Sequence, residues 1–486
     1  MAARLTAFLV AIIVGISVVA GLIVGAQREA DPAVDVLVYN GRVYTGDPNA
    51  PIAEAVAIRG NRILKIGTNR EIKRLRRNAA TVIDAHGGSI LPGFADTYVA
   101  VPGQAEAIAG IHRLGLTSVG AVVDDLTAFD ALAALAATAD RPIRVAAALK
   151  VTLPLSEAAR HEIDARRAQS ATALVRLDAL ALEVTLPGPK PAPRLARATA
   201  SRRQAPPPLL PNDQQQGLLE LDRAGWPLVL HVDDERELSV ALDVVARLIE
   251  TNTSVAAPRR HRVVLAHPMP LDTARLATLG LTVAMPLPAT WTGVAVDRSA
   301  AADTSAPGAT ASGASADVTL AAATVAPPAP LADPAILPFS FPLPEGVRLV
   351  MGSDIVADPR LGLQALVGGA LAPRAEATGS TTPATDACEA PEAAAKAEGD
   401  AAETTPVDRH LVIGALATLT TDAADALGAH AEWGTLEAGR LADLVVLSAD
   451  LFELPASHLL DAVVIATIVD GKVVYDRDTD TPPPTP

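Results

Sequence analysis

The sequence has a single cysteine among its 486 residues, so no disulfide can form within the chain and a disulfide-stapled scaffold is excluded. Basic residues are also scarce, because 40 lysines and arginines face 55 acidic residues, which gives a formal net charge of −15. This charge disfavours attraction to a phosphate backbone, and we expect no nucleic-acid partner. No internal repeat of fixed period is present. A chain of this length forms roughly two to four domain-sized units, or one large α/β barrel with additions.

Long apolar runs are rare as well, although half of the residues are hydrophobic, because much of that share is alanine spread along the chain. The exception is the stretch from Leu5 to Ala26, which contains only two polar residues. Roughly 20 apolar residues are enough to cross the hydrocarbon core of a bilayer as a helix. We therefore predict an N-terminal transmembrane helix within residues 1–30, used as an uncleaved anchor. A cleaved signal peptide is the alternative.

The charges that flank this segment indicate its orientation. Arg4 and the amino terminus precede the apolar stretch, whereas Arg28 is followed by Glu29 and Asp31. Because positive charge favours the cytoplasmic side, the N-terminus is predicted to lie inside. A single span would then hold the main domain outside the cytoplasm at the cytoplasmic membrane. Cleavage of the segment would instead give a secreted protein.

Two later stretches have a composition that cannot form a core. Residues 297–335 consist mainly of Ala, Thr, Ser, Pro and Gly, and residues 373–407 repeat this composition with added acidic residues. Such segments cannot bury enough apolar surface to offset their chain entropy, so we expect surface inserts or linkers. Cys388 lies in the second insert and is interpreted as an incidental exposed thiol. The proline-rich residues 478–486 are expected to be a disordered tail.

Between these breaks, short β-branched runs alternate with helical stretches rich in alanine and leucine. Eight runs are predicted as strands: Ser89–Phe94, Leu116–Val123, Ile143–Val151, Leu174–Val184, Pro227–Val232, Arg262–Ala266, Leu281–Met285 and Val347–Met351. Helices are predicted between most of them: Gln104–Arg113, Ala128–Ala137, Glu235–Glu250 and Leu271–Leu279. Alternation of this kind implies parallel pairing through crossovers. It predicts an α/β fold with a (β/α)8 TIM-type barrel over residues 92–430, whose chemistry lies at the C-terminal strand ends.

The two flanks of the barrel have a different pattern. Residues 34–91 contain short strand candidates separated by turn signals such as Asn40-Gly41, which is typical of an antiparallel sheet. Residues 434–477 repeat this pattern at the other end of the chain. We expect the two halves to complete one small composite β-sandwich beside the barrel.

Three segments resemble a known family. Val38–Tyr44, Ile90–Asp96 and Gly434–Leu447 look like the corresponding motifs of the amidohydrolase superfamily, and most of all like amidohydrolase family 3, which includes N-substituted formamide deformylase-like proteins. The resemblance extends from about Val34 to Asp476 apart from the two inserts. It implies a metal-dependent barrel hydrolase with a small composite β-sandwich, acting on amide or other C–N bonds of small-molecule substrates.

The first metal site that this resemblance implies is incomplete. In the family, a His-x-His pair follows the first barrel strand, but Tyr98 and Ala100 occupy those positions here. Alanine offers no donor atom, and neutral tyrosine is a poor substitute for imidazole. The family's bridging lysine is also missing from the fourth strand, where Glu183 is the acidic residue near enough to serve. The chain is therefore interpreted as a divergent member of the family.

Other ligand positions of the family are retained. His231 and His267, at the ends of the fifth and sixth strands, match its later histidine ligands. Asp354, after the eighth strand, matches the carboxylate that binds metal and takes a proton from the attacking water. Together with Glu183, these residues would form a site for one divalent metal, most readily zinc, with an open position for water.

The sequence leaves several functions open. One is a membrane-anchored hydrolase with an altered site for a single metal, and another is a protein without catalysis whose barrel serves as a binding or scaffold module and holds no metal. The lost ligands, and the loss of the long segment that follows the first strand in the family, favour altered or absent activity. A purely structural metal is a third possibility, distinguished by four protein ligands and no labile water. The sequence does not indicate an oligomeric state.

Overall fold

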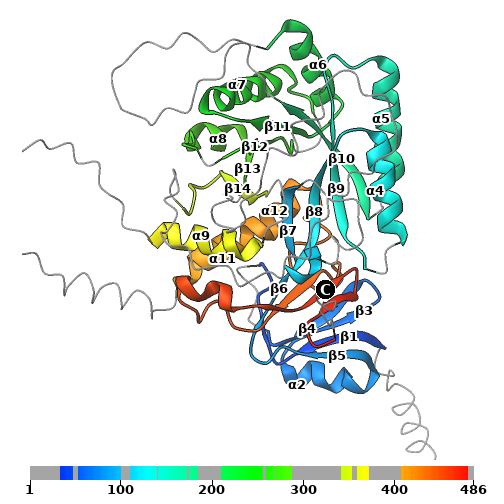
Figure 1. Ribbon diagram of the computed structural model, residues 1–486, viewed down its shortest axis with the longest axis vertical. Coiled ribbons are helices and arrows are strands. Elements are labelled where there is room, and N and C mark those ends of the chain that lie inside the picture. The colour runs from blue at the N-terminus through cyan, green and yellow to red at the C-terminus, as the bar shows by residue number, and fades with distance from the viewer. Residues whose placement is uncertain are drawn as a thin grey trace, which may run out of the picture.

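The computed structural model of the chain describes residues 33–47, 53–99, 110–138, 141–171, 174–183, 210–255, 259–267, 269–286, 341–352, 358–371 and 407–479. Within these ranges a barrel ringed by helices stands on a smaller unit rich in strands (Figure 1). No helix in these ranges is both long and apolar enough to cross a membrane. The predicted helix over Leu5–Ala26, most of the two inserts, Cys388 and most of the tail lie outside the described residues.

Eight parallel strands form the barrel, in the order β14-β13-β12-β11-β10-β9-β8-β7. Their bounds are β7 (Phe94–Val99), β8 (Leu116–Val123), β9 (Arg144–Lys150), β10 (Val175–Glu183), β11 (Leu228–Val232), β12 (Arg262–Leu265), β13 (Thr282–Met285) and β14 (Arg348–Met351). The hydroxyl of Thr97 on β7 donates to the carbonyl oxygen of Met351 on β14 at 2.7 Å, so the first and last strands lie side by side. This nearly closed sheet confirms the predicted TIM-type barrel.

Helices surround the barrel in the described ranges, and their bounds are α4 (Leu126–Thr138), α5 (Glu157–Ser170), α6 (Asn212–Arg223), α7 (Glu235–Thr251), α8 (Thr273–Leu279), α9 (Pro359–Leu371), α11 (Arg409–Leu419) and α12 (Thr421–Ala426). Helix α7 is an example of how the sequence determines where a helix starts and which of its faces is buried. The carboxylate of Asp234 accepts from the backbone amides of Arg236 and Glu237 and so caps the helix start. Leu238, Leu242 and other apolar residues at helical spacing bury one face against the barrel.

The smaller unit consists of two sheets. One has the strand order β4-β3-β1-β5, and the other has the order β17-β16-β15-β6-β2. The elements are β1 (Val34–Tyr39), β2 (Arg42–Val43), β3 (Ala55–Arg59), β4 (Arg62–Gly67), α2 (Asn69–Ile72), η1 (Lys73–Asn78), β5 (Ala79–Asp84), β6 (Ser89–Pro92), β15 (Leu444–Leu447), η4 (Ala456–Asp461), β16 (Val464–Val469) and β17 (Lys472–Asp476). Val38 and Ile58 of the first sheet share a hydrophobic cluster with Val446 and Ile468 of the second. Because β15 pairs with β6, strands from both ends of the chain lie in one sheet.

Two expectations about strand pairing were wrong. Ser89–Phe94 is not one barrel strand, because β6 joins the small sheet and the barrel begins only at Phe94. Gly93 lies at this change of sheet, where a Cβ atom would come within 2.2 Å of Thr117, so a larger residue would not fit. The small sheets are also mixed rather than antiparallel, since β1 pairs with β5 and β2 pairs with β6 in parallel. The crossover through α2 and η1 makes the first of these pairings possible.

His112 is completely buried just before β8. Its Nδ1 atom lies 3.2 Å from the carbonyl oxygen of Leu116, and burial lowers the pKa of the imidazole from 6.5 to about 4. The unfolded chain therefore takes up this proton first as the pH falls, and stability is lost in that direction. We expect the free energy of unfolding to fall by about 2 kcal/mol through this residue between pH 7 and pH 5. Urea unfolding at both pH values, compared with His112→Asn, measures the effect. An equal pH dependence in both proteins would contradict it.

Candidate functional site

Three of the residues that the sequence assigns to a metal come from adjacent barrel strands. Glu183, the last residue of β10, pairs in register with His231 of β11, and His231 pairs with Val264 of β12. His267 follows the end of β12 by two residues. Because neighbouring parallel strands end at the same edge, all three positions lie at the C-terminal end of the barrel. The side chain of Glu183 and the whole of Asp354 lie outside the described residues.

The surroundings of the two histidines differ. The His231 side chain is 25% exposed, and its Nδ1 atom lies 3.7 Å from a carboxylate oxygen of Asp233. His267 is exposed. The His231 ring also stacks on Tyr98, with 5.9 Å between the ring centroids and 26° between the planes. His231 is therefore partly accessible and restrained on one side by an aromatic ring.

Tyr98 is held firmly at the end of β7. Its backbone amide donates to the Asp96 carboxylate at 3.1 Å, so Asp96 caps the local turn. A Cβ atom on Gly352, beyond the end of β14, would lie only 2.8 Å from the Tyr98 Cβ, so the glycine leaves the space that this side chain needs. Tyr98 packs against a cluster in the barrel interior that includes Val264 and Ala284. Ala100, the other substituted position, lies outside the described residues.

The barrel interior contains a buried positive charge near the N-terminal ends of the strands. Arg262, the first residue of β12, is completely buried, and its guanidinium donates to the carbonyl oxygen of Ala426 at the end of α12 at 2.7 Å. Burial lowers the pKa of Arg262 to about 10, so the side chain is still charged at neutral pH. The nearby carboxylate of Asp178 pairs with Arg260, at 2.8 and 2.9 Å. Arg262 therefore connects the N-terminal end of β12 to the end of α12 through this hydrogen bond.

Arg262 is one of several arginines near the N-terminal strand ends that contact the segment from Asp425 to Asp443. The contacts pair Arg144 of β9 with Asp443, Arg176 of β10 with Glu432, Arg262 of β12 with Ala426, and Arg348 of β14 with Asp425. None of these arginines is among the candidate residues that the sequence indicates. Their position is visible in the sequence, because each arginine is the first or second residue of its strand. The acidic or carbonyl group that each one contacts is not.

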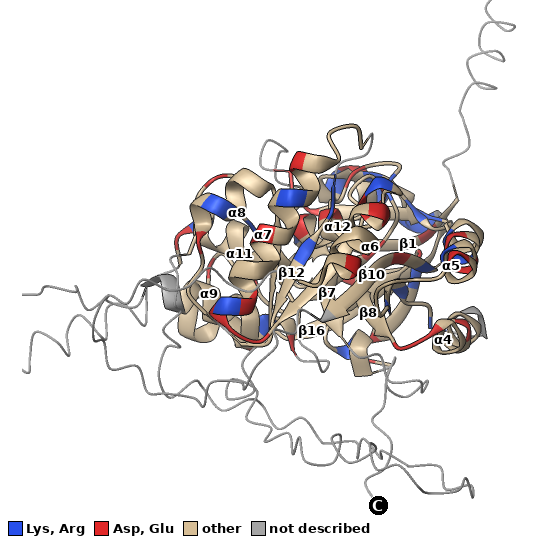
Figure 2. Cartoon of the chain, turned by 90° about the horizontal axis from the view of Figure 1, so that it is seen from above, with Lys and Arg blue, Asp and Glu red and all other residues tan. Residues whose placement is uncertain are grey.

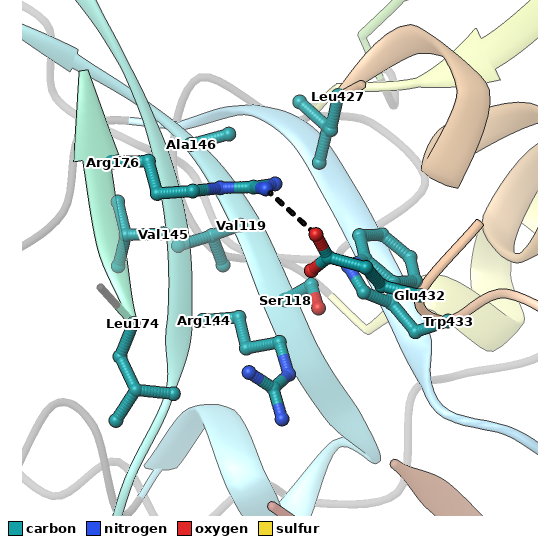
Figure 3. Close-up of a pocket in the computed structure, with 10 residues that line it drawn as sticks. All are labelled: Ser118, Val119, Arg144, Val145, Ala146, Leu174, Arg176, Leu427, Glu432 and Trp433. Atoms are coloured by element: carbon teal, nitrogen blue, oxygen red, sulfur yellow. Dashed lines mark hydrogen bonds and ion pairs between the residues drawn. The ribbon is translucent and has the colours of Figure 1, made fainter. Parts of the chain in front are cut away.

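A cavity of about 20 Å³ lies beside two of these arginines, between β8, β9 and β10 and the segment around Glu432 (Figure 3). Arg144, Arg176, Ser118 and Trp433 are among its lining residues. The Ser118 hydroxyl is buried and has no hydrogen-bond partner within the described ranges. The cavity has the size of one water molecule, which would satisfy this hydroxyl. It lies at the barrel end opposite His231, so it is not part of the predicted site.

The predicted donors have the right chemistry for a metal. Imidazole nitrogens and carboxylate oxygens are zinc ligands, and His231 and His267 place two imidazoles on neighbouring strands. In the ranges that the structure describes, no group of three or more His, Cys, Asp or Glu side chains comes together in a way that could hold a metal ion. The described histidines alone are therefore an incomplete ligand set, and the two carboxylates would have to complete it.

Comparison with known proteins decides the family. The model of the Amidohydrolase family matches residues 101–475, which is more than half of the chain. The chain belongs to the amidohydrolase family. The match includes seven of the eight barrel strands and the returning strands β15, β16 and most of β17, so membership extends over both parts of the fold. It confirms the family assignment made from the motifs.

Individual relatives of this amidohydrolase match over short stretches. A 5-methylthioadenosine/S-adenosylhomocysteine deaminase of Symbiobacterium thermophilum is 40% identical over 88 residues, which is 16% of this chain and 19% of the relative. An N-substituted formamide deformylase of Arthrobacter pascens is 34% identical over 64 residues, 13% of this chain and 12% of the relative. The matches thus cover between 11% and 19% of the length of the curated relatives.

The amidohydrolase fold is also found in solved structures. An adenosine deaminase from Xanthomonas campestris, solved with bound zinc, superposes with a TM-score of 0.55. The superposition covers 93% of this chain and 96% of the other at 16% sequence identity. At this identity, the likeness supports the shared fold of barrel and small unit alone.

Proposed function

We propose that this amidohydrolase-family protein hydrolyses C–N bonds of small molecules at the C-terminal end of its barrel. The observation that carries the proposal is the register of three strands, which brings Glu183, His231 and His267 to one edge. Family membership supports a hydrolytic reaction, and the deaminase and deformylase among the relatives act on C–N bonds by their names. We propose an amide-type substrate.

We propose that His231 and His267 hold one divalent metal, most readily zinc, together with Glu183 and Asp354. Such a metal, when bound, activates a water molecule for attack on a carbonyl carbon or related centre. Tyr98 stacks on the ring of His231 and would limit its rotation. Asp354 would accept the proton of the attacking water and return it to the leaving nitrogen.

A second candidate is a binding module without catalysis. Tyr98 supports it, because this side chain packs in the barrel interior at a position where the family has a metal-binding histidine. In this case the barrel would bind its ligand without a metal, and the hydrolytic residues would have no catalytic role.

We further propose that residues 5–26 anchor the protein in the cytoplasmic membrane, with the barrel on the outer side. The length and composition of the apolar segment support this location. Secretion after cleavage of the segment is the alternative, and the mass of the mature protein distinguishes the two.

Metal analysis of the full chain, purified in detergent without chelators or metal affinity resins, tests the proposed site. We expect about one zinc, iron or manganese ion per chain, because the predicted ligand set holds a single ion. The double variant His231→Ala/His267→Ala is expected to lose it, since both imidazole ligands are gone. Plasma mass spectrometry provides the measurement, and screening of amides and formamides follows if the metal is present.

The matched control is His410→Ala/His430→Ala, which removes two exposed histidines that pair with Asp408 and Asp425. It is expected to keep the full metal content. Folded wild-type protein that is metal-free, and that takes up no zinc on dialysis, would reject the hydrolase and favour the binding module. Equal metal loss in both double variants would reject the assigned ligands.

A further inference from the structure

The elements α2 and η1 cover the outer face of the four-stranded sheet. Ile72 and Leu75 bury their side chains in a cluster with Val34, Leu37 and Tyr39 of β1. Thr68 caps the start of α2 through a capping box with Glu71, which fixes the first turn. One side of this short helical segment is therefore anchored in the small unit, and the other side faces solvent.

The solvent side is strongly basic. Between Asn69 and Asn78 the sequence has five basic residues and one acidic residue, in a chain whose net charge is −15. Arg70, Arg74 and Arg77 are all exposed; Arg74 and Arg77 lie three residues apart on one side of the 3-10 helix η1, and Arg70 precedes them in α2. These three arginines are called here the basic face. None of these three arginines has an acidic partner among the residues that the structure describes.

The other two basic residues of this segment, Lys73 and Arg76, are also exposed but lie over the ring of Tyr39. The Lys73 ammonium lies 4.5 Å above the ring of Tyr39, and the Arg76 guanidinium lies 5.3 Å from the same ring. Lys73 also donates to the Asn40 side chain at 2.7 Å. These contacts hold the segment on the sheet and leave the basic face outside.

Two partly exposed arginines on the barrel helices are paired instead. Arg160 binds Glu220 and Arg275 binds Asp243 across neighbouring helices. Figure 2 shows the positions of basic and acidic residues interspersed along the ribbon around α7 and α8. Three neighbouring exposed arginines without acidic partners thus distinguish the basic face from these helices, and they are free to meet an anionic partner.

The place of the basic face in the chain points to the nature of this partner. Val34, in the cluster beneath α2 and η1, lies eight residues after Ala26, where the predicted membrane segment ends. Eight residues span at most about 28 Å, so the basic face would lie close to the bilayer surface if that segment is an anchor. Clusters of basic residues next to a membrane span bind anionic headgroups through their charge.

We propose that Arg70, Arg74 and Arg77 dock the small unit against anionic phospholipid headgroups of the membrane that carries the anchor. The inference rests on the proposed N-terminal anchor. The acidic remainder of the surface would be repelled by the same headgroups, so this contact gives the protein one orientation. The barrel helices α6 and α7 lie at the far end of the molecule from α2, so docking would hold them away from the bilayer (Figure 1).

The test uses energy transfer from the full chain to lipid headgroups in nanodiscs. Cys388→Ser removes the native thiol, and Ala80→Cys places a donor dye on exposed β5 directly after η1. The acceptor is a headgroup-labelled lipid in discs of phosphatidylcholine, with or without phosphatidylglycerol. We expect higher transfer in the anionic discs. Arg74→Gln/Arg77→Gln is expected to lower the docking equilibrium about 30-fold and to bring the transfer close to the value in neutral discs.

The matched control Arg236→Gln/Arg247→Gln removes the same charge from exposed positions on α7 and is expected to keep the transfer high. Transfer that is equal in both lipid compositions, or that falls equally in both variants, would overturn the proposal. Binding of a labelled DNA duplex that disappears in Arg74→Gln/Arg77→Gln would overturn it in favour of nucleic acid. Retention of the chain in neutral discs reports on the anchor separately, so failure of the anchor and failure of the basic face can be distinguished.

Discussion

Replacing Asp222 by alanine is expected to lower the free energy of unfolding by about 3–5 kcal/mol, because it leaves the partly buried Arg259 and the buried His261 and Asn252 without their common acceptor. Asp222 at the end of α6 is 1% exposed. Its carboxylate accepts from Arg259 at 2.8 Å, from the Asn252 amide at 2.8 Å and from His261 at 3.0 Å. Burial alone would raise the pKa of Asp222, but the hydrogen bonds from His261, Arg259 and Asn252 outweigh it and hold the pKa well below its usual value.

The measurement is equilibrium unfolding in urea, followed by tryptophan fluorescence. Asp130→Ala is the matched control, because it removes an aspartate that pairs with Arg166 on the surface. Its carboxylate is 47% exposed, so the loss is expected to stay below about 1 kcal/mol. Equal losses in the two variants would contradict a structural role for the buried network.

Replacing Arg144 by methionine is expected to cost a similar amount, about 3–5 kcal/mol, since it leaves a buried carboxylate without its cation. Arg144 at the start of β9 pairs with Asp443 and with Asp470, and so joins the barrel to the small unit. The Asp443 side chain is 1% exposed, and burial raises its pKa although Arg144 opposes this. A carboxylate with a raised pKa destabilises the fold as the pH rises through that pKa, so the loss should be larger at pH 8 than at pH 5.

Unfolding in guanidinium chloride at both pH values measures this effect. Adding Asp443→Asn to Arg144→Met is expected to recover part of the stability, because it removes the stranded charge. Arg160→Met, whose partner Glu220 is 48% exposed, is the control and should cost less than about 1 kcal/mol. A loss in Arg144→Met that does not depend on pH, and no recovery in the double variant, would show that the buried charge is not its cause.

The barrel could be predicted from the sequence because its strands are buried on both faces. β8 begins at Leu116 and ends at Val123 as expected, and seven of its eight residues are buried. A mostly apolar run of this length between helical patterns is typical of a parallel strand. The local pattern therefore contains nearly all the information that these elements need.

The pairing of strands that are far apart in the chain could not be predicted from local sequence patterns. β6 reads as the start of the barrel because Phe94 follows it closely, yet its partner β15 lies some 350 residues later in the chain. Parallel pairing of β1 with β5 likewise depends on the crossover between them rather than on either strand's own pattern. Tertiary contacts of this kind override local turn signals.

In the candidate site, too, the positions set by local patterns could be predicted, whereas the contacts between distant strands could not. The positions of His231 and His267 at the ends of adjacent strands follow from the strand pattern and the family motifs, and the structure has them there. The stacking of Tyr98 on His231 and the space left by Gly352 depend on contacts between β7, β11 and β14. Metal binding by His231, His267, Glu183 and Asp354 stays a prediction.

The shared sheet of the small unit also has a consequence for synthesis of the chain. β2 and β6 lie in one sheet with β15, β16 and β17, so these early strands wait for partners that are synthesised much later. Until then, β6 has an open edge where β15 will pair, and such an edge is a site for pairing with other chains. The small unit can therefore close only after β15, β16 and β17 have emerged, so it completes its fold later than the barrel strands that precede them.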